Sequence, residues 1–194
     1  MKLYAGMGSR STPSDALVFI EELAYLMAKR GYGLRSGGAQ GADMAFERGC
    51  DRAGGLKAIW LPWSGFNNRV PENHSVAVGS QLEAYKQASK FHFTWNHLKT
   101  SVRAMHARTE HILCGSRIIT PRYVDFLITW TPLGLDTGGA GQAIRSATAK
   151  GIPVFNLGDP SKRYPEMIEE WIEEHHKEEE PWESVSESQT AVWV

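Results

Sequence analysis

The sequence has few cysteines, and none stands in a pattern that binds metal or builds a disulfide scaffold. Cys50 and Cys114 are the two cysteines of the 194 residues, and neither belongs to a CxxC motif or has histidines at ligand spacing. This scarcity disfavours a structural zinc site and a disulfide-stabilised secreted domain. We therefore expect two free thiols in a reducing cytosol, with no metal and no cofactor.

Long hydrophobic runs are also missing. No segment approaches the roughly 20 apolar residues of a transmembrane helix, and residues 1–6 lack the apolar stretch of a signal peptide. A Walker lysine motif, a complete GxGxxG motif and an internal repeat are absent too. We expect a soluble cytoplasmic protein with no membrane partner, and the sequence disfavours an ATPase or a standard NAD dehydrogenase.

Charge is distributed unevenly along the chain. Residues 1–160 hold 18 basic and 12 acidic residues, whereas residues 161–194 hold 3 and 10. We accordingly expect one nucleotide-binding domain over 1–160, followed by an acidic helix and a flexible tail over 161–194. A moderately basic body suits a phosphorylated ligand. The acidic end would discourage unspecific binding of nucleic acid, or it is simply a charged helix that faces water.

Apolar strand-like runs alternate with amphipathic helical segments. Strands are expected at residues 3–5, 34–36, 57–61, 123–130 and 153–156. Helices are expected at about 13–30, 44–50, 80–89, 98–114, 141–150 and 165–174. Thr12, which precedes a proline, is expected to cap the first helix with its hydroxyl. This alternation predicts an α/β fold, a Rossmann-like, doubly wound, mostly parallel sheet with helices on both faces.

Three glycine-rich segments follow strand-like runs, at Gly8-Ser9-Arg10, Ser36–Asp43 and Asp136–Gln142. In a parallel sheet such segments meet at one edge, where ligands bind. Glycine lets backbone N–H groups approach an anion, and the N-terminus of a following helix adds partial positive charge. The pattern predicts a phosphate-binding site. The residues assigned to it are Gly8, Ser9, Arg10, Ser36, Gly37, Gly38, Gly41, Arg108, Thr137, Gly138, Gly139, Gly141, Gln142 and Arg145.

Together and in this order, these segments resemble the SLOG superfamily, which unites the DNA-processing protein DprA with the LOG nucleotide hydrolases. Residues 36–43 are similar to the DprA-type pattern Ser-Gly-x-Ala-x-Gly-x-Asp, and residues 137–145 to the LOG-type glycine loop. The likeness covers about residues 1–157 and includes a stretch around His106-Ala107-Arg108 that resembles small DprA-like proteins of phages and bacteria. It implies a Rossmann-like homo-oligomer that binds a nucleotide, a nucleotide derivative or single-stranded DNA.

LOG enzymes cleave the bond between a base and ribose 5′-phosphate, and this chain departs from their pattern at the reacting position. Arg145 stands where the family has its catalytic glutamate, and Gln142 and Thr137 replace its threonine and proline. Exchange of an anion for a cation favours capture of a phosphorylated ligand. Alternatively, Arg145 is a solvated residue of a helix.

Two acids remain as catalytic candidates, Asp43 and Asp136. Cleavage of an N-glycosidic bond passes through an oxocarbenium-like species, and a carboxylate stabilises this cation or activates the attacking water. Alternatively, Asp43 caps backbone amides and Asp136 stabilises the turn before two glycines. Two functions therefore stay open: an N-glycosidase that acts on nucleoside 5′-monophosphates, and a protein that sequesters a nucleotide or binds single-stranded DNA without turnover.

Overall fold

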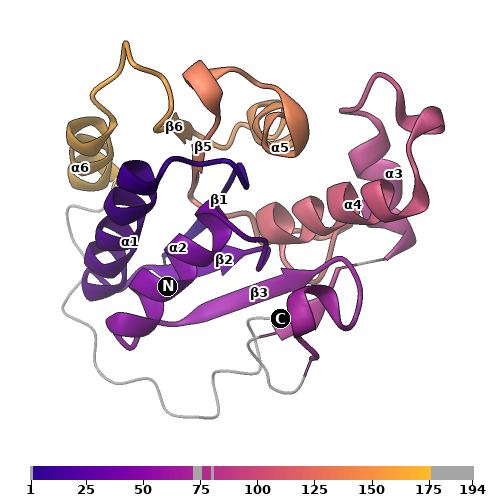
Figure 1. Cartoon of the computed structure of the whole chain (residues 1–194), viewed down its shortest axis with the longest axis horizontal. Coiled ribbons are helices and arrows are strands. Elements are labelled where there is room, and N and C mark those ends of the chain that lie inside the picture. Colours follow the sequence, from indigo (N-terminus) through magenta and orange to yellow (C-terminus); the bar gives the residue numbers. More distant parts are fainter. Residues whose placement is uncertain (1, 72–75, 80, 176–194) are drawn as a thin grey trace.

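A computed structural model describes residues 2–71, 76–79 and 81–175 (Figure 1). Its described strands form one six-stranded sheet in the order β4-β3-β2-β1-β5-β6, and every pair is parallel. The strands are β1 (Leu3–Gly8), β2 (Gly33–Ser36), β3 (Lys57–Leu61), β4 (Val76–Val78), β5 (Phe126–Trp130) and β6 (Val154–Asn156). The helices are α1 (Ser14–Lys29), α2 (Ala42–Arg52), α3 (Leu82–Ser89), α4 (Thr100–Cys114), α5 (Gly138–Ala149) and α6 (Tyr164–His175).

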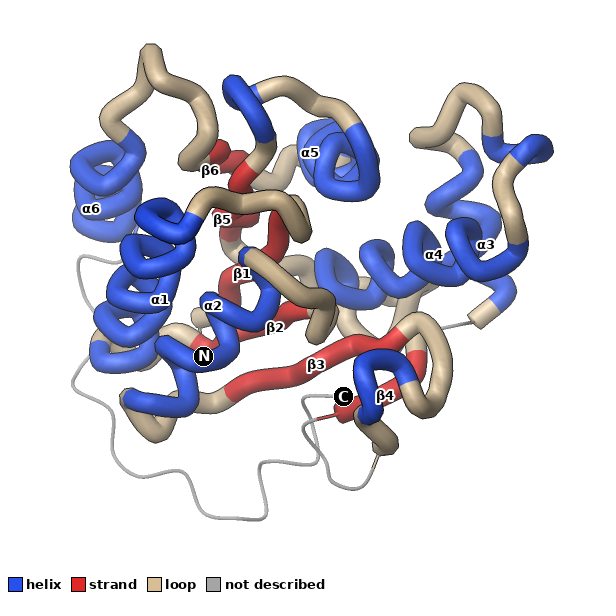
Figure 2. The backbone as a smooth tube through the Cα atoms, in the orientation of Figure 1, coloured by secondary structure: helices blue, strands red, loops and turns tan. Residues whose placement is uncertain are grey.

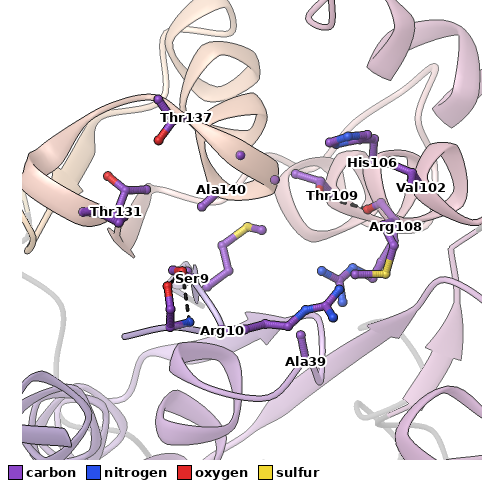
Figure 3. A pocket seen from close by; sticks show the side chains of 17 residues that line it. Ser9, Arg10, Ala39, Val102, His106, Arg108, Thr109, Thr131, Thr137 and Ala140 are labelled. Atoms are coloured by element: carbon purple, nitrogen blue, oxygen red, sulfur yellow. Dashed lines mark hydrogen bonds between the residues drawn. The ribbon is translucent and has the colours of Figure 1, made fainter. Parts of the chain in front are cut away.

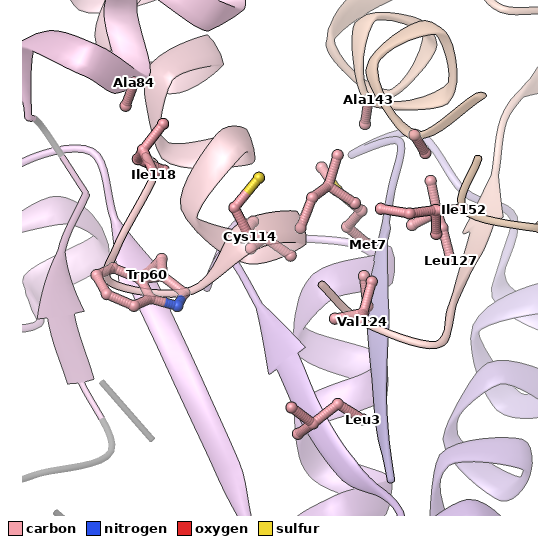
Figure 4. Close-up of a cluster of buried hydrophobic side chains, with 14 of the residues drawn as sticks. Leu3, Met7, Trp60, Ala84, Cys114, Ile118, Val124, Leu127, Ala143 and Ile152 are labelled. Atoms are coloured by element: carbon pink, nitrogen blue, oxygen red, sulfur yellow. The ribbon is translucent and has the colours of Figure 1, made fainter. Parts of the chain in front are cut away.

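Helices cover both faces of the sheet (Figure 2). Successive strand residues point to opposite faces, so Tyr4 of β1 joins the core under α1, α2 and α6, while Leu3 and Ala5 join the core under α3, α4 and α5. Figure 4 shows the second of these cores, which includes Leu127 and Ala143. Burial on both faces explains why β1, β3 and β5 are almost continuously apolar.

The order of strands reverses at β1, which pairs with β2 on one side and with β5 on the other. The chain leaves β1 toward α1 on one face and leaves β5 toward α5 on the opposite face. These departing segments separate at the carboxyl ends of the two strands and open a crevice between them. The fold thus places the loop after β1 opposite the loop after β5.

The α/β prediction is confirmed, and four details differ from it. Strand β4, which is only three residues long, was not predicted, and β5 begins at Phe126 rather than Tyr123. The hydroxyl of Thr12 donates to the Ser9 carbonyl oxygen at 2.8 Å, and α1 begins at Ser14 without a side-chain cap. Helix α5 begins at Gly138, three residues early, so two glycines expected before the helix form its first turn.

The two cysteines are buried thiols on opposite faces of the sheet, and burial raises the pKa of each to about 12. Among the described residues, no helix is long and apolar enough to cross a membrane, and no group of acidic, histidine and cysteine side chains is arranged to hold a metal ion. The acidic tail expected beyond α6 lies outside the described residues.

Candidate functional site

A cavity of ≈ 480 Å³ opens at the carboxyl ends of β1 and β5 (Figure 3). Its walls come from residues 7–11 at and just after the end of β1, residues 102–109 of α4 and residues 131–140 from the end of β5 to the first turn of α5, together with Ala39. A volume of this size falls in the range of about 300–1,000 Å³ that small-molecule sites occupy. The cavity lies at the reversal of strand order, where doubly wound sheets bind their ligands.

One wall is the segment Asp136–Gly141, which we call the open loop. Its residues Gly138, Gly139 and Ala140 line the cavity and form the first turn of α5. A Cβ placed on either glycine would meet no other atom within 4 Å. Their N–H groups and that of Ala140 have no acceptor among the described residues, since Thr137 provides no side-chain cap. These N–H groups, with the helix dipole behind them, are suited to an anion.

The first glycine-rich segment, Ser36–Asp43, is packed against the protein's own groups, and we call it the closed loop. The guanidinium of Arg108 donates to the Gly37 carbonyl oxygen, and the Asn67 amide donates to the Gly38 carbonyl oxygen at 2.8 Å. A Cβ on Gly37 would lie 2.7 Å from the Asp43 carboxylate. The loop therefore has little room for a ligand.

The two ends of the closed loop are fixed as well. The hydroxyl of Ser36 donates to the Gly6 carbonyl oxygen at 2.7 Å. Gly41 has a φ of +81°, and a Cβ there would lie 2.6 Å from the Ser9 carbonyl oxygen. Of the closed loop, Ala39 alone lines the cavity. Its glycines allow the loop to pack against the segment after β1.

Asp43 lies beneath the cavity rather than in its lining. Its side chain is 1% exposed, and its two oxygens accept hydrogen bonds from the Gly8 N–H at 3.0 Å and the Ala39 N–H at 3.2 Å. The Arg108 guanidinium is 3.7 Å away. Burial raises the pKa of Asp43, and the charge of Arg108 opposes that shift. These contacts fasten the end of β1 to the closed loop, and the amides that Asp43 binds lie outside α2, whose N-terminus has no side-chain cap.

Two arginines line the cavity and differ in what holds them. Arg108 is 4% exposed and is fixed by Asp43 and Gly37, and its pKa is lowered chiefly by burial, with a further contribution from the charge of Arg10. Arg10 has no hydrogen bond or ion pair within the described part of the chain. Figure 3 shows its side chain extending across the cavity toward Ala39 and Arg108. Arg10 is thus a cation available to a ligand.

Three further residues assigned from the sequence lie outside the cavity lining. Arg145 donates to the main-chain oxygens of Asp136, at 2.6 Å, and of Phe91, at 3.0 Å. It fastens the open loop to the segment after α3, which differs from both alternatives that the sequence offered. The Asp136 side chain is 59% exposed, 3.5 Å from Arg145. Gln142 is fully buried.

His106 is a cavity residue that the sequence did not reveal. It is 5% exposed in the wall formed by α4, and its Nδ1 lies 3.2 Å from the side-chain oxygen of Gln142. Burial lowers its pKa to about 4, helped by His92, Arg145 and Arg108 and opposed by the hydrogen bond to Gln142. The imidazole is therefore neutral near pH 7. The resemblance around His106-Ala107-Arg108 assigned a ligand-binding role to Arg108 and none to His106, whose contact with α5 is visible only in the folded chain.

No family model matches the chain, and no curated protein matches it. Among solved structures, it is similar to the X-ray structure of a protein named TM1055, at 22% identity and a TM-score of 0.47 over 79% of this chain and 72% of that one. It is also similar to the molybdenum cofactor binding protein of the phototrophic bacterium Rippkaea orientalis, at 15% identity and a TM-score of 0.46 over 89% and 96% of the two chains.

These similarities concern the arrangement of helices and strands and carry no information on the ligand. The resemblance to the SLOG superfamily stays a prediction. The chain itself forms a Rossmann-like α/β protein with a cavity at the reversal point of a parallel sheet.

Proposed function

We propose that the protein binds a small phosphorylated molecule of the nucleotide class, with a phosphate at the open loop. The observation that carries this proposal is the first turn of α5, whose N–H groups at Gly138, Gly139 and Ala140 border the cavity without an acceptor. Arg10 borders the same cavity without a counter-ion among the described residues. Helix N–H groups and a guanidinium together provide the hydrogen bonds and positive charge that a phosphate requires.

The remainder of the cavity supports a ligand that extends beyond its phosphate. Val102 and Met105 of α4 contribute apolar surface, and His106 of the same helix contributes a polar atom. Apolar walls with a few placed polar groups are typical of sites for small organic molecules. The resemblance to the SLOG superfamily adds the nucleotide class to this chemistry.

Binding of a small molecule is favoured over binding of single-stranded DNA. Proteins that bind single strands track the backbone with a long positively charged groove and stack bases on exposed aromatic rings. Here Arg10 and Arg108 converge on one cavity, and the chain as a whole has a net charge of −1. A low dependence of affinity on salt would agree with one or two phosphate contacts, and a steep dependence would favour DNA.

Capture of the ligand is favoured over hydrolysis of an N-glycosidic bond by either acid. Asp43 is occupied by two backbone N–H groups and lies near Arg108, and neither it nor Asp136 is in the lining of the cavity. A carboxylate that acts on a sugar or its attacking water must come within hydrogen-bond distance. The resemblance to LOG enzymes keeps hydrolysis as the second candidate, so free base is measured alongside binding.

The test is calorimetric titration of the protein with the four common ribonucleoside 5′-monophosphates, the matching nucleosides and inorganic phosphate. We expect Arg10→Ala to weaken binding of the monophosphates about tenfold or more, because a hydrogen bond to a charged group contributes about 1.5–3 kcal/mol. Nucleoside affinity should change far less. The matched control is Arg163→Ala, since that side chain is 85% exposed just before α6.

Failure of every phosphorylated probe to bind, or equal binding by wild type and Arg10→Ala, would overturn the proposal. Chromatography of the same mixtures after prolonged incubation detects free base. Its release would establish the glycosidase, and its absence beside tight binding would establish a protein that captures nucleotides.

A further inference from the structure

His106 is fixed in the cavity wall by contacts on two sides. Its ring packs against His92, with centroids 4.9 Å apart, and against Trp95 at 6.2 Å. On another side its Nδ1 meets the amide of Gln142 from α5. Figure 3 shows the imidazole in the wall that α4 contributes. A side chain held in this way has a defined orientation, so the role of each ring nitrogen can be assigned.

A buried chain of hydrogen bonds determines which nitrogen carries the proton. The Glu110 carboxylate is 2.8 Å from Lys150 Nζ and accepts a hydrogen bond from Ser146 Oγ at 2.8 Å. The Gln142 Nε2 donates to Glu110 Oε1 at 3.4 Å, which leaves the Gln142 Oε1 facing His106. An amide oxygen only accepts hydrogen bonds. The His106 Nδ1 therefore carries the proton and donates it to Gln142.

The other ring nitrogen, Nε2, is then an acceptor, and it has no donor within the described part of the chain. Protonation of this nitrogen is disfavoured by burial and by the positive charges of Arg108 and Arg145, with His92 acting in the same direction. The Glu110 carboxylate is linked to the ring only through Gln142 among the contacts of the described residues. The imidazole thus offers an uncharged acceptor at the cavity.

Besides hydroxyl groups, which can donate or accept, the rest of the polar lining offers strong donors. The first turn of α5 presents N–H groups, and Arg10 and Arg108 present guanidinium groups. The Thr109 hydroxyl is engaged with the main-chain oxygen of Met105 at 3.3 Å. An anion matches the donors, whereas the acceptor on His106 requires a hydroxyl or an N–H group.

We propose that His106 is a ligand-binding residue whose Nε2 accepts a hydrogen bond from a hydroxyl or N–H group of the molecule whose phosphate lies at the open loop. This inference rests on the proposed function and adds a second recognition point to it. The site then selects ligands with an anion at one end and a hydrogen-bond donor at the other. A ribose hydroxyl and an N–H group of a base both have this chemistry.

Two substitutions separate the acceptor from the packing of the ring. His106→Asn keeps a donor near the position of Nδ1, so the hydrogen bond to Gln142 is retained, but it removes the acceptor at the cavity. His106→Gln places an amide oxygen near the position of Nε2. Each variant is titrated with inorganic phosphate, ribose 5-phosphate and the four ribonucleoside 5′-monophosphates. Thermal unfolding of both variants provides the check on folding.

We expect His106→Asn to bind inorganic phosphate like wild type and to bind at least one nucleoside monophosphate about tenfold more weakly, the usual effect of one lost hydrogen bond that leaves a donor unpaired. His106→Gln should recover part of this loss. A loss shared by ribose 5-phosphate places the donor on the sugar, and a loss confined to the nucleotides places it on the base.

Unchanged nucleotide affinity in a folded His106→Asn protein would overturn this inference while leaving the proposed function standing. An equal loss for inorganic phosphate and nucleotides would also overturn it, because His106 would then act only by positioning α5. Wild-type protein that binds none of the phosphorylated probes would overturn both proposals. Should His106→Asn not fold, nitrogen NMR of the wild-type imidazole decides: the Nε2 signal must shift with nucleotide and stay unchanged with inorganic phosphate.

Discussion

The closed loop and the open loop each join a strand to a helix at the same edge of the sheet, yet their glycines have different surroundings. In the closed loop, a Cβ on Gly37 or Gly41 would collide with Arg108 and Asp43 or with the segment after β1. In the open loop, a Cβ on Gly138 or Gly139 would meet nothing within 4 Å, and Gly141, at the end of the loop, is the glycine there whose Cβ would collide, with the Asp136 carbonyl group. Glycine thus permits close packing of the chain upon itself in one loop, and it leaves backbone N–H groups accessible in the other.

The charged groups at the two loops also differ in whether the protein itself provides their partners. The closed loop surrounds the buried pair of Asp43 and Arg108, whose groups are already matched by contacts within the protein. At the open loop, Arg145 donates to the main-chain oxygen of Asp136 and does not belong to the cavity lining. A phosphate therefore finds unmatched N–H groups at the open loop, with Arg10 across the same cavity, while the closed loop acts as the support that holds Arg108 in the wall.

The largest effect is expected when the buried pair of Asp43 and Arg108, which supports the closed loop, is broken. Asp43→Ala leaves the Arg108 charge buried without its partner and removes the acceptor of the Gly8 and Ala39 N–H groups. Loss of one member of a buried pair costs about 3–5 kcal/mol of unfolding free energy. Asp136→Ala, at an exposed position of the open loop, should change it by about 0.5 kcal/mol or less. Urea unfolding of both variants measures the difference, and equal stabilities would refute the division of roles.

A smaller effect comes from adding one methyl group to each loop. Gly37→Ala forces a Cβ within 2.7 Å of the Asp43 carboxylate, and overpacking of this kind destabilises by about 1–3 kcal/mol. Gly139→Ala meets open space, so we expect stability within about 0.5 kcal/mol of wild type. Its methyl group lies beside the N–H groups of the first helical turn and should weaken phosphate binding. Thermal unfolding and phosphate titration of both variants test these expectations. A Gly139→Ala protein less stable than the Gly37→Ala protein would contradict them.

The smallest expected effect is the response to acid. The folded pKa of His106, about 4, lies below its ordinary value of 6.5, so the unfolded chain binds more protons between these values. As the pH is lowered from 7.5 to 5.5, the titration of His106 should therefore lower the unfolding free energy by on the order of 1 kcal/mol. Burial raises the pKa of Asp43, so this carboxyl group binds its proton more readily in the folded chain than in the unfolded chain. Its effect on the unfolding free energy therefore has the opposite sign and does not add to the loss.

The check is urea unfolding at several pH values for wild type and His106→Asn. The variant should show a shallower decline, with the remainder contributed by His111, whose pKa is also lowered by burial. An identical decline in both proteins would exclude His106 as the source.

Much of the fold was predictable because it depends on which residues are apolar and where glycines interrupt them. Buried strands and amphipathic helices leave a periodic record, and the parallel order follows from their alternation. Strand β4 left no such record, since three residues are too few to show a period. The start of α5 was misplaced because Gly138 and Gly139 favour no helix by propensity, and the packing of the rest of the helix determines its first turn.

The position of the candidate site could be predicted from the sequence, but the contacts of its individual residues could not. Strand ends followed by glycines located the edge of the sheet and included Arg10. Sequence spacing cannot distinguish an arginine that faces a cavity from one that binds a carbonyl oxygen in its own loop, as Arg145 does. Nor does it reveal that Gln142 orients His106, because that contact joins positions 36 residues apart on two helices.

The cavity walls come from residues 7–11, 102–109 and 131–140, which are brought together only when the chain is folded. A molecule that binds there has no comparable site on the unfolded chain, so its binding free energy is added to the stability of the fold. At a concentration 100 times its dissociation constant, this gain is about 2.7 kcal/mol. The melting temperature of the protein is therefore a general readout for its ligand, and a library of phosphorylated metabolites can be screened by heat alone before any reaction is known.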